Sequence, residues 1–340
     1  MNYFITILML FIFILTIFSG RQMQTQQKIN ELFNKKEVTI LVTDSGLGGL
    51  SVAADLAAKM PKSGVFKKAH IVFFNALFHS GSGYNYLKSD SEKVRIFDIV
   101  LNAMDNQYHP DLLLIACNTL SVIYDQTPFS KKATFPVVGI VEKGVDLIAK
   151  QLQKNRLATA LIFGMQTTIE ANAHQRLLVQ RGFSAEKIIS QACPLLADYI
   201  EEGYNSEMTA LLISEFVGQA IKQLKQPGAP AVASLNCTHF GYSKHLFVKA
   251  FAEAGYDNVT IIDPNPEMSD FLFASKYLNR YPTTEVTVEV VSKTRITEQK
   301  MKSLCSLVEL ISAQTGFALK NYRYEPELFE AKFDSSKIEF

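Results

Sequence analysis

Short apolar runs alternate with longer amphipathic segments along most of this chain. The apolar runs predict strands at 38–43, 70–74, 111–116, 137–141, 159–163, 231–235 and 259–262. The amphipathic segments predict helices at 50–60, 91–108, 144–154, 168–181, 206–225 and 243–254. Fully apolar strands separated by helices are typical of parallel sheets that are covered on both faces. The pattern therefore predicts an α/β protein.

The length and the rhythm of the pattern predict more than one domain. The chain has 340 residues, which exceeds the usual size of a single domain. A second α/β unit begins with the strand at 137–141. From residue 283 onward the pattern adds a strand at 285–291 and a helix at 298–314, which we interpret as an appended extension without chemistry.

The N-terminal segment differs from the rest of the chain. Residues 3–20 carry no charge, and this length is near the lower limit for a helix that crosses a bilayer. We therefore interpret residues 1–22 as a membrane anchor or a signal peptide, outside the fold. Positive charges follow the apolar run, which favours an anchored protein with a cytoplasmic catalytic part, with an exported, periplasmic protein as the alternative. Translation starting at Met23 is a further alternative.

Charge and cysteine spacing argue against several function classes. Lys and Arg number 34 and Asp and Glu 33, so electrostatics do not favour a nucleic-acid partner. The four cysteines form no CxxC pair, which argues against a zinc knuckle or a disulfide framework and predicts free thiols and no metal. The loop at 44–51 holds Gly46 and Gly48, but Ser51 breaks the dinucleotide fingerprint and no phosphate-loop lysine follows. No cofactor is predicted.

Three reactive side chains directly follow predicted strands. Asp44, Cys117 and Cys237 are each followed by small polar residues, and ligands of open α/β sheets bind beyond the carboxyl ends of strands. Hydroxyl and amide groups there suit a small-molecule amino-acid ligand. The alternative for a cysteine is a small buried apolar residue, which is how we interpret Cys193 and Cys305. For Asp44 the alternative is a helix-capping turn residue, and for His239 it is an interior histidine with satisfied hydrogen bonds.

Five segments in order resemble the glutamate racemases of the aspartate/glutamate racemase superfamily. They are DSGLGGLS (44–51), ACNT (116–119), FPVVGIVE (135–142), ACPLLADYIEEG (192–203) and NCTHF (236–240). The resemblance implies two similar doubly wound parallel-sheet domains with the active site in the cleft between them. It places the first domain at 37–136 plus 244–282, the second at 137–243 and the extension at 283–340.

The resemblance also implies the roles of individual residues. Cys117 and Cys237 are the catalytic thiols, Asp44 and His239 assist them, and Glu201 supports the histidine. The residues that would contact the substrate are Ser45, Asn118, Thr119, Thr168 and Thr238. The implied activity is a cofactor-independent interconversion of L- and D-glutamate, which supplies D-glutamate to bacterial cell-wall peptidoglycan synthesis.

Two thiols suit racemisation because the α-proton leaves from one face and another proton arrives at the opposite face. A homodimer and membrane association through residues 3–20 remain open partner hypotheses.

One segment departs from the family pattern. The Pro-Tyr-Gly turn after the second strand is replaced by Ser80-Gly81-Ser82-Gly83-Tyr84. This difference bears on which substrate is bound more than on the type of reaction. The sequence therefore keeps other hypotheses open: a racemase for aspartate or another amino acid, or a non-catalytic amino-acid-binding protein of the same fold. A thiol hydrolase that uses Cys237 and His239 would leave Cys117 unexplained.

Overall fold

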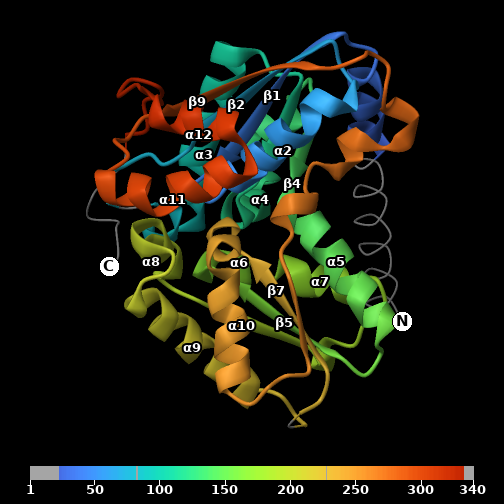
Figure 1. Cartoon of the computed structure of the whole chain (residues 1–340), viewed down its shortest axis with the longest axis vertical. Coiled ribbons are helices and arrows are strands. Elements are labelled where there is room, and N and C mark those ends of the chain that lie inside the picture. Colours follow the sequence, from blue (N-terminus) through green and yellow to red (C-terminus); the bar gives the residue numbers. More distant parts are fainter. Residues whose placement is uncertain (1–22, 82, 227, 333–340) are drawn as a thin grey trace, which may run out of the picture.

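Two β-sheets, each built from parallel strands, form the framework of the molecule (Figure 1). The structure is a computed structural model that describes residues 23–81, 83–226 and 228–332. The described strands form a six-stranded sheet and a four-stranded sheet, and every recorded strand pair is parallel. The predicted fold class, two parallel α/β units, is confirmed.

The first sheet has the strand order β10-β9-β2-β1-β3-β4. Its strands are β1 (Glu37–Asp44), β2 (Lys68–Asn75), β3 (Leu112–Ile115), β4 (Val137–Gly139), β9 (Glu285–Ser292) and β10 (Arg323–Tyr324). From β1 the chain passes first to β2 on one side and then to β3 on the other. The order therefore reverses between β1 and β3, and such a switch point is where open α/β sheets bind ligands.

The second sheet repeats this arrangement with the order β6-β5-β7-β8. Its strands are β5 (Thr159–Gly164), β6 (Ile188–Ala192), β7 (Ala231–Asn236) and β8 (Val259–Ile262). Here the order reverses between β5 and β7. β8 pairs with β7, whereas we expected residues 244–282 to return to the first domain.

Helices cover both faces of the sheets in three apolar layers. One layer packs α3 and α4 on the first sheet, and another packs α5 and α7 on the second. The third joins the two sheets, because it contains residues of α2, β5, β7 and α11. The helices of these layers are α2 (Leu50–Ser63), α3 (Asp90–Tyr108), α4 (Asn118–Tyr124), α5 (Ile140–Lys154), α7 (Ala173–Gln180) and α11 (Glu298–Ile311). The others are α6 (Gln166–Glu170), α8 (Leu196–Gly203), α9 (Glu207–Lys222), α10 (Lys244–Glu253) and α12 (Ala313–Lys320).

The C-terminal region, which we expected to be an appended extension, contributes a strand to the first sheet. β9 pairs with β2 over eight residues, from Lys68 opposite Glu285 to Asn75 opposite Ser292. Helices α11 and α12 then pack on α2 (Figure 1). The region after residue 283 is therefore part of the first sheet and its helical cover.

The helix predicted at 168–181 is divided in the structure. α6 and α7 are separated at Asn172, whose φ of 52° lies in the left-handed region. Asparagine tolerates this conformation better than most residues, so it can end one helix and begin the next. Periodicity alone does not detect this break, because both short helices keep an apolar face.

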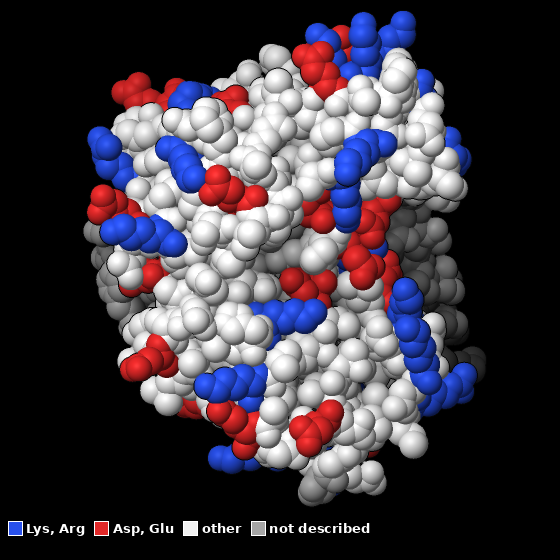
Figure 2. Space-filling view, in the orientation of Figure 1, with Lys and Arg blue, Asp and Glu red and all other residues white. Residues whose placement is uncertain are grey.

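The expectation of a membrane-anchored protein is corrected. The apolar run at 3–20, on which it rested, lies outside the described residues. Among residues that are described, the structure contains no helix with the length and apolar character needed to span a bilayer. Acidic and basic side chains are interspersed over the face shown in Figure 2.

Candidate active site

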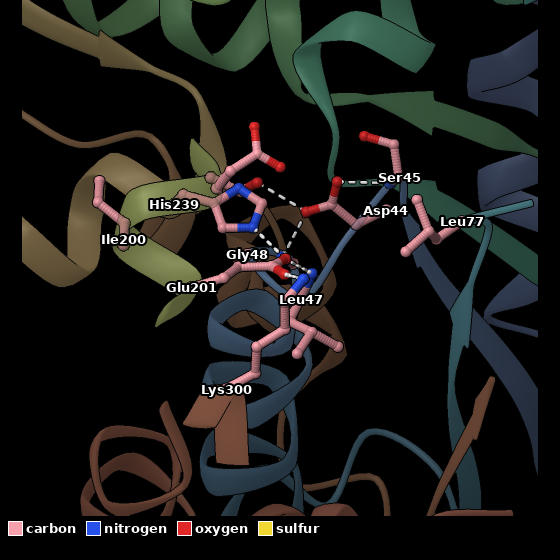
Figure 3. Close-up of polar contacts among 12 residues, drawn as sticks. Asp44, Ser45, Leu47, Gly48, Leu77, Ile200, Glu201, His239 and Lys300 are labelled. Carbon is pink, nitrogen blue, oxygen red and sulfur yellow. Dashed lines mark hydrogen bonds and ion pairs between the residues drawn. The ribbon is translucent and has the colours of Figure 1, made fainter. Parts of the chain in front are cut away.

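The predicted reactive residues lie at the two switch points. Asp44 is the last residue of β1, Cys117 caps helix α4 just beyond β3, and Cys237 directly follows β7. A hydrogen bond of 2.6 Å, donated by the Thr238 hydroxyl to the Asp44 carboxylate, connects the two strand ends. The carboxyl edges of both sheets therefore meet at one place, where Figure 3 shows Asp44, Glu201 and His239.

Cys237 belongs to a linear chain of polar contacts. Its Sγ lies 3.7 Å from Nδ1 of His239, and Nε2 of His239 lies 2.7 Å from Oε1 of Glu201. All three side chains are buried. Burial opposes a charge on His239, yet its contacts with Cys237 and Glu201 raise its pKa well above the usual value. The imidazole of His239 therefore lies between the sulfur of Cys237 and the carboxylate of Glu201.

Cys117 has a different environment. Its Sγ lies 3.2 Å from the Ser45 hydroxyl. Burial and, after it, the charge of Asp44 raise the pKa of the Cys117 thiol well above its usual value, while the Ser45 contact acts in the opposite direction. Cys117 is therefore held as a thiol. The two sulfurs therefore have different settings, one beside His239 and the other beside the Ser45 hydroxyl.

Asp44 is committed to hydrogen bonds within the protein. Its Oδ1 accepts from the Ser45 amide at 2.6 Å, and its Oδ2 accepts from the Gly49 amide and from Thr238. These contacts fix the turn between β1 and α2 and add a link between the two sheets, although the N-cap residue of α2 is Gly49 and not Asp44. The assisting role that we expected for Asp44 stays a prediction.

Several polar atoms around Cys117 have no partner in the described part of the chain. The side-chain oxygen of Asn118 and the hydroxyl of Tyr84 are buried without a hydrogen bond. Burial raises the pKa of Tyr84 well above its usual value, and Tyr84 packs in the same apolar cluster as Cys117. Buried polar groups without a partner are unfavourable, and a polar ligand would satisfy them.

The other residues predicted to bind substrate are distributed between the two halves of the site. Thr119 and Thr168 lie with their hydroxyls 3.3 Å apart, which brings together α4 of the first unit and α6 of the second. All of the residues predicted to contact the substrate, except Ser45, are buried. Burial alone does not separate active cysteines from structural ones, because Cys193 and Cys305 are also buried.

The glycine loop allows the two halves to approach closely. A Cβ at Gly48 would lie 2.7 Å from the His239 amide nitrogen and would also contact the Thr238 hydroxyl. A Cβ at Gly46 would lie 2.6 Å from Oε1 of Glu201. The absence of a side chain at Gly46 and Gly48 therefore leaves room for the Glu201 carboxylate and for the backbone at His239.

We predict that Gly48→Ala loses most activity and that its unfolding free energy falls by about 1–3 kcal/mol, because the backbone at His239 must move. The matched control is Gly218→Ala, since a Cβ there meets nothing within 4 Å and alanine favours a helix. Activity and urea denaturation measure both variants. Equal behaviour of the two variants would contradict the prediction.

Sequence reasoning missed two lysines near the site. Lys300 of α11 donates to Oε2 of Glu201 at 2.6 Å (Figure 3). Lys93 of α3 is buried and donates to the Thr167 hydroxyl at 3.0 Å, between the two halves. Nothing in the local pattern identifies Lys300, whereas the position of Lys93 on the apolar face of a predicted helix is an available signal.

Comparisons with known proteins identify related sequences. No family model matches the chain. A glutamate racemase of Chlorobium phaeobacteroides is 26% identical over 67% of this chain and 75% of that protein. A glutamate racemase of Neisseria meningitidis serogroup A is 28% identical over 65% of this chain and 74% of that protein.

Solved structures show the same fold. The structure of glutamate racemase from Francisella tularensis in complex with D-glutamate has a TM-score of 0.61 and 23% identity. The match covers 81% of this chain and 93% of that one. No group of His, Cys, Asp and Glu side chains that could hold a metal ion is found among the residues described.

The chain has the α/β fold of solved glutamate racemases, and the sequence comparisons indicate an enzyme of the isomerase class. Among such enzymes, the chain is glutamate racemase-like. The similarity supports amino-acid racemisation as the type of reaction.

Proposed function

We propose that this protein interconverts L- and D-glutamate without a cofactor, using Cys117 and Cys237 as a pair of acid and base. The supporting observation is the unequal setting of the two sulfur atoms, which lie just beyond β3 and β7, in two sheets whose carboxyl edges the hydrogen bond from Thr238 to Asp44 connects. Cys237 has a protonated histidine beside it, whereas burial and Asp44 keep Cys117 protonated. Proteins named glutamate racemases resemble this chain over about two thirds of its length.

The proposed reaction transfers two protons and forms no covalent bond to the enzyme. The Cys237 thiolate removes the α-proton from one face of the substrate, and the C–H electrons remain as a carbanion. The Cys117 thiol donates its proton to the opposite face, which forms the new C–H bond and leaves a thiolate at Cys117. The inverted product leaves, and the Cys117 thiolate can then start the reverse reaction.

The proposed substrate contacts come from the polar atoms that lack partners. The Asn118 oxygen would accept a hydrogen bond from the substrate ammonium group, and the Tyr84 hydroxyl would donate to a carboxylate. The hydroxyls of Thr119, Thr168 and Thr238 and of Ser45 would complete the site. Tyr84 belongs to the segment that replaces the family's Pro-Tyr-Gly turn, so the side-chain specificity rests on this loop.

The test is incubation of the full chain with L-glutamate in deuterated water without added cofactor. We expect the α-proton to exchange with deuterium, which proton NMR would measure. We also expect the optical rotation of the solution to disappear. Exchange with aspartate or another amino acid, but not with glutamate, would keep the mechanism and change the substrate. Binding without exchange would favour the amino-acid-binding protein and would overturn the proposal.

A further inference from the structure

We propose that Lys300 is a positioning residue that acts through Glu201 to hold the His239–Cys237 pair in its reactive arrangement. This inference rests on the proposed function. It assigns a role in the chemistry to the C-terminal region, in which the sequence pattern shows none.

The carboxylate of Glu201 is fixed by contacts at both oxygens. Oε1 accepts hydrogen bonds from His239 at 2.7 Å and from the Leu47 amide at 2.6 Å. Oε2 accepts from Lys300 at 2.6 Å. Rotation of the carboxylate would break these contacts together, so Lys300 fixes the plane in which Glu201 meets the imidazole (Figure 3).

Helix α11 stays attached to α8 by contacts that do not involve the Lys300 ammonium group. The Ser303 hydroxyl donates to the Ile200 carbonyl at 3.1 Å, and the Gln299 amide donates to the Glu202 carbonyl at 2.8 Å. The backbone amide of Lys300 donates to the hydroxyl of Thr297, which caps the N-terminus of the helix. Removing only the ammonium group should therefore leave the helix in place and separate positioning from attachment.

The charges around Glu201 come from several elements. The titratable groups that face it or share its contacts are Asp198 and Glu202 of α8, Cys237, His239 and Tyr242 beyond β7, and Lys300 of α11. Burial works to raise the pKa of Glu201, but His239 and Lys300 outweigh it and lower the pKa to about 2. Burial opposes the charge on Lys300, while Glu201 raises its pKa.

The sign of the effect follows from Coulomb's law. Loss of the Lys300 cation favours the protonated form of the nearby Glu201 carboxyl, whose pKa Lys300 helps to lower. Glu201 then carries the charge that supports His239 only at higher pH. A shift of one pH unit lowers the reactive fraction roughly tenfold on the acid side of the profile.

The experiment compares Lys300→Met, Lys300→Gln and Lys300→Arg, with Lys302→Met as the control on an exposed part of the same helix. We expect kcat/KM of Lys300→Met to fall roughly tenfold near neutral pH, mainly through kcat, and its acid limb to move to higher pH. Lys300→Gln should resemble Lys300→Met, because it keeps a hydrogen bond but no charge. Lys300→Arg and Lys302→Met should resemble the wild type.

A second readout does not depend on racemisation. Peptide mass spectrometry measures the rate at which iodoacetamide alkylates Cys237 at each pH. The pH at which this rate rises should be higher in Lys300→Met than in the wild type. An inactive wild type would refute the proposed function and leave this readout to decide the inference. Unchanged profiles in an active Lys300→Met, or a lower Tm with an unmoved acid limb and alkylation profile, would overturn the role of Lys300.

Discussion

Alanine at Cys117 or at Cys237 is expected to lower racemisation by about a thousandfold, since each variant lacks the proton donor or acceptor on one face of the substrate. The two variants should also differ in the contacts that each one removes. Cys237→Ala leaves His239 and Glu201 in place, whereas Cys117→Ala removes the contact with Ser45. Rates measured from both enantiomers by circular dichroism test the loss.

The control variants are Cys193→Ala and Cys305→Ala, which remove buried cysteines to which we assign no chemistry. Each should retain activity, apart from a modest loss of stability at a buried position. Both directions of the reaction must lose kcat/KM by the same factor, because two enantiomers have an equilibrium constant of unity in water. Full activity in Cys117→Ala or Cys237→Ala would remove that cysteine from the mechanism.

Glu201→Gln is expected to abolish most activity and to lower the unfolding free energy by about 3 kcal/mol at neutral pH, because His239 and Lys300 lose their buried counter-charge. Glu202→Gln, an exposed neighbour on the same helix, is the control. Urea denaturation and initial rates measure both effects. Similar stability of the two variants would show that the buried carboxylate contributes nothing.

The same variant predicts a pH dependence. The Glu201 pKa is lowered from 4.5 to about 2 in the folded protein, by His239 and Lys300 against the effect of burial. Its ionised form therefore contributes stability above pH 4.5, and this contribution is lost as the pH falls toward 2. Between these values the wild type should lose more stability than Glu201→Gln. A parallel decline of the two curves would contradict this assignment.

The α/β fold was predictable because its strands are local and strongly apolar. The runs at 38–43 and 231–235 become the central strands β1 and β7, which are buried on both faces. Strand membership was less predictable. Residues 259–262 pair in the second sheet and residues 285–292 in the first. Long-range pairing decides which sheet a strand joins, and the alternation of apolar and polar residues within a strand does not indicate its partner.

The site was predictable where strand ends and a resemblance coincide. Asp44 ends β1, and Cys117 and Cys237 lie just beyond β3 and β7, so their convergence requires only that the carboxyl edges of the two sheets meet. Lys300 was not predictable, because it lies 99 positions from Glu201 on a helix whose register is set by tertiary packing. The break at Asn172 was missed because a single left-handed residue leaves the apolar pattern intact.

Strand β9 determines when the molecule can be completed during synthesis. Asn75 of β2 and Ser292 of β9 share a hydrogen bond, although 217 positions separate them. Until the ribosome has released β9, β2 exposes an open edge that invites pairing with other nascent chains. The unit translated first is therefore finished last.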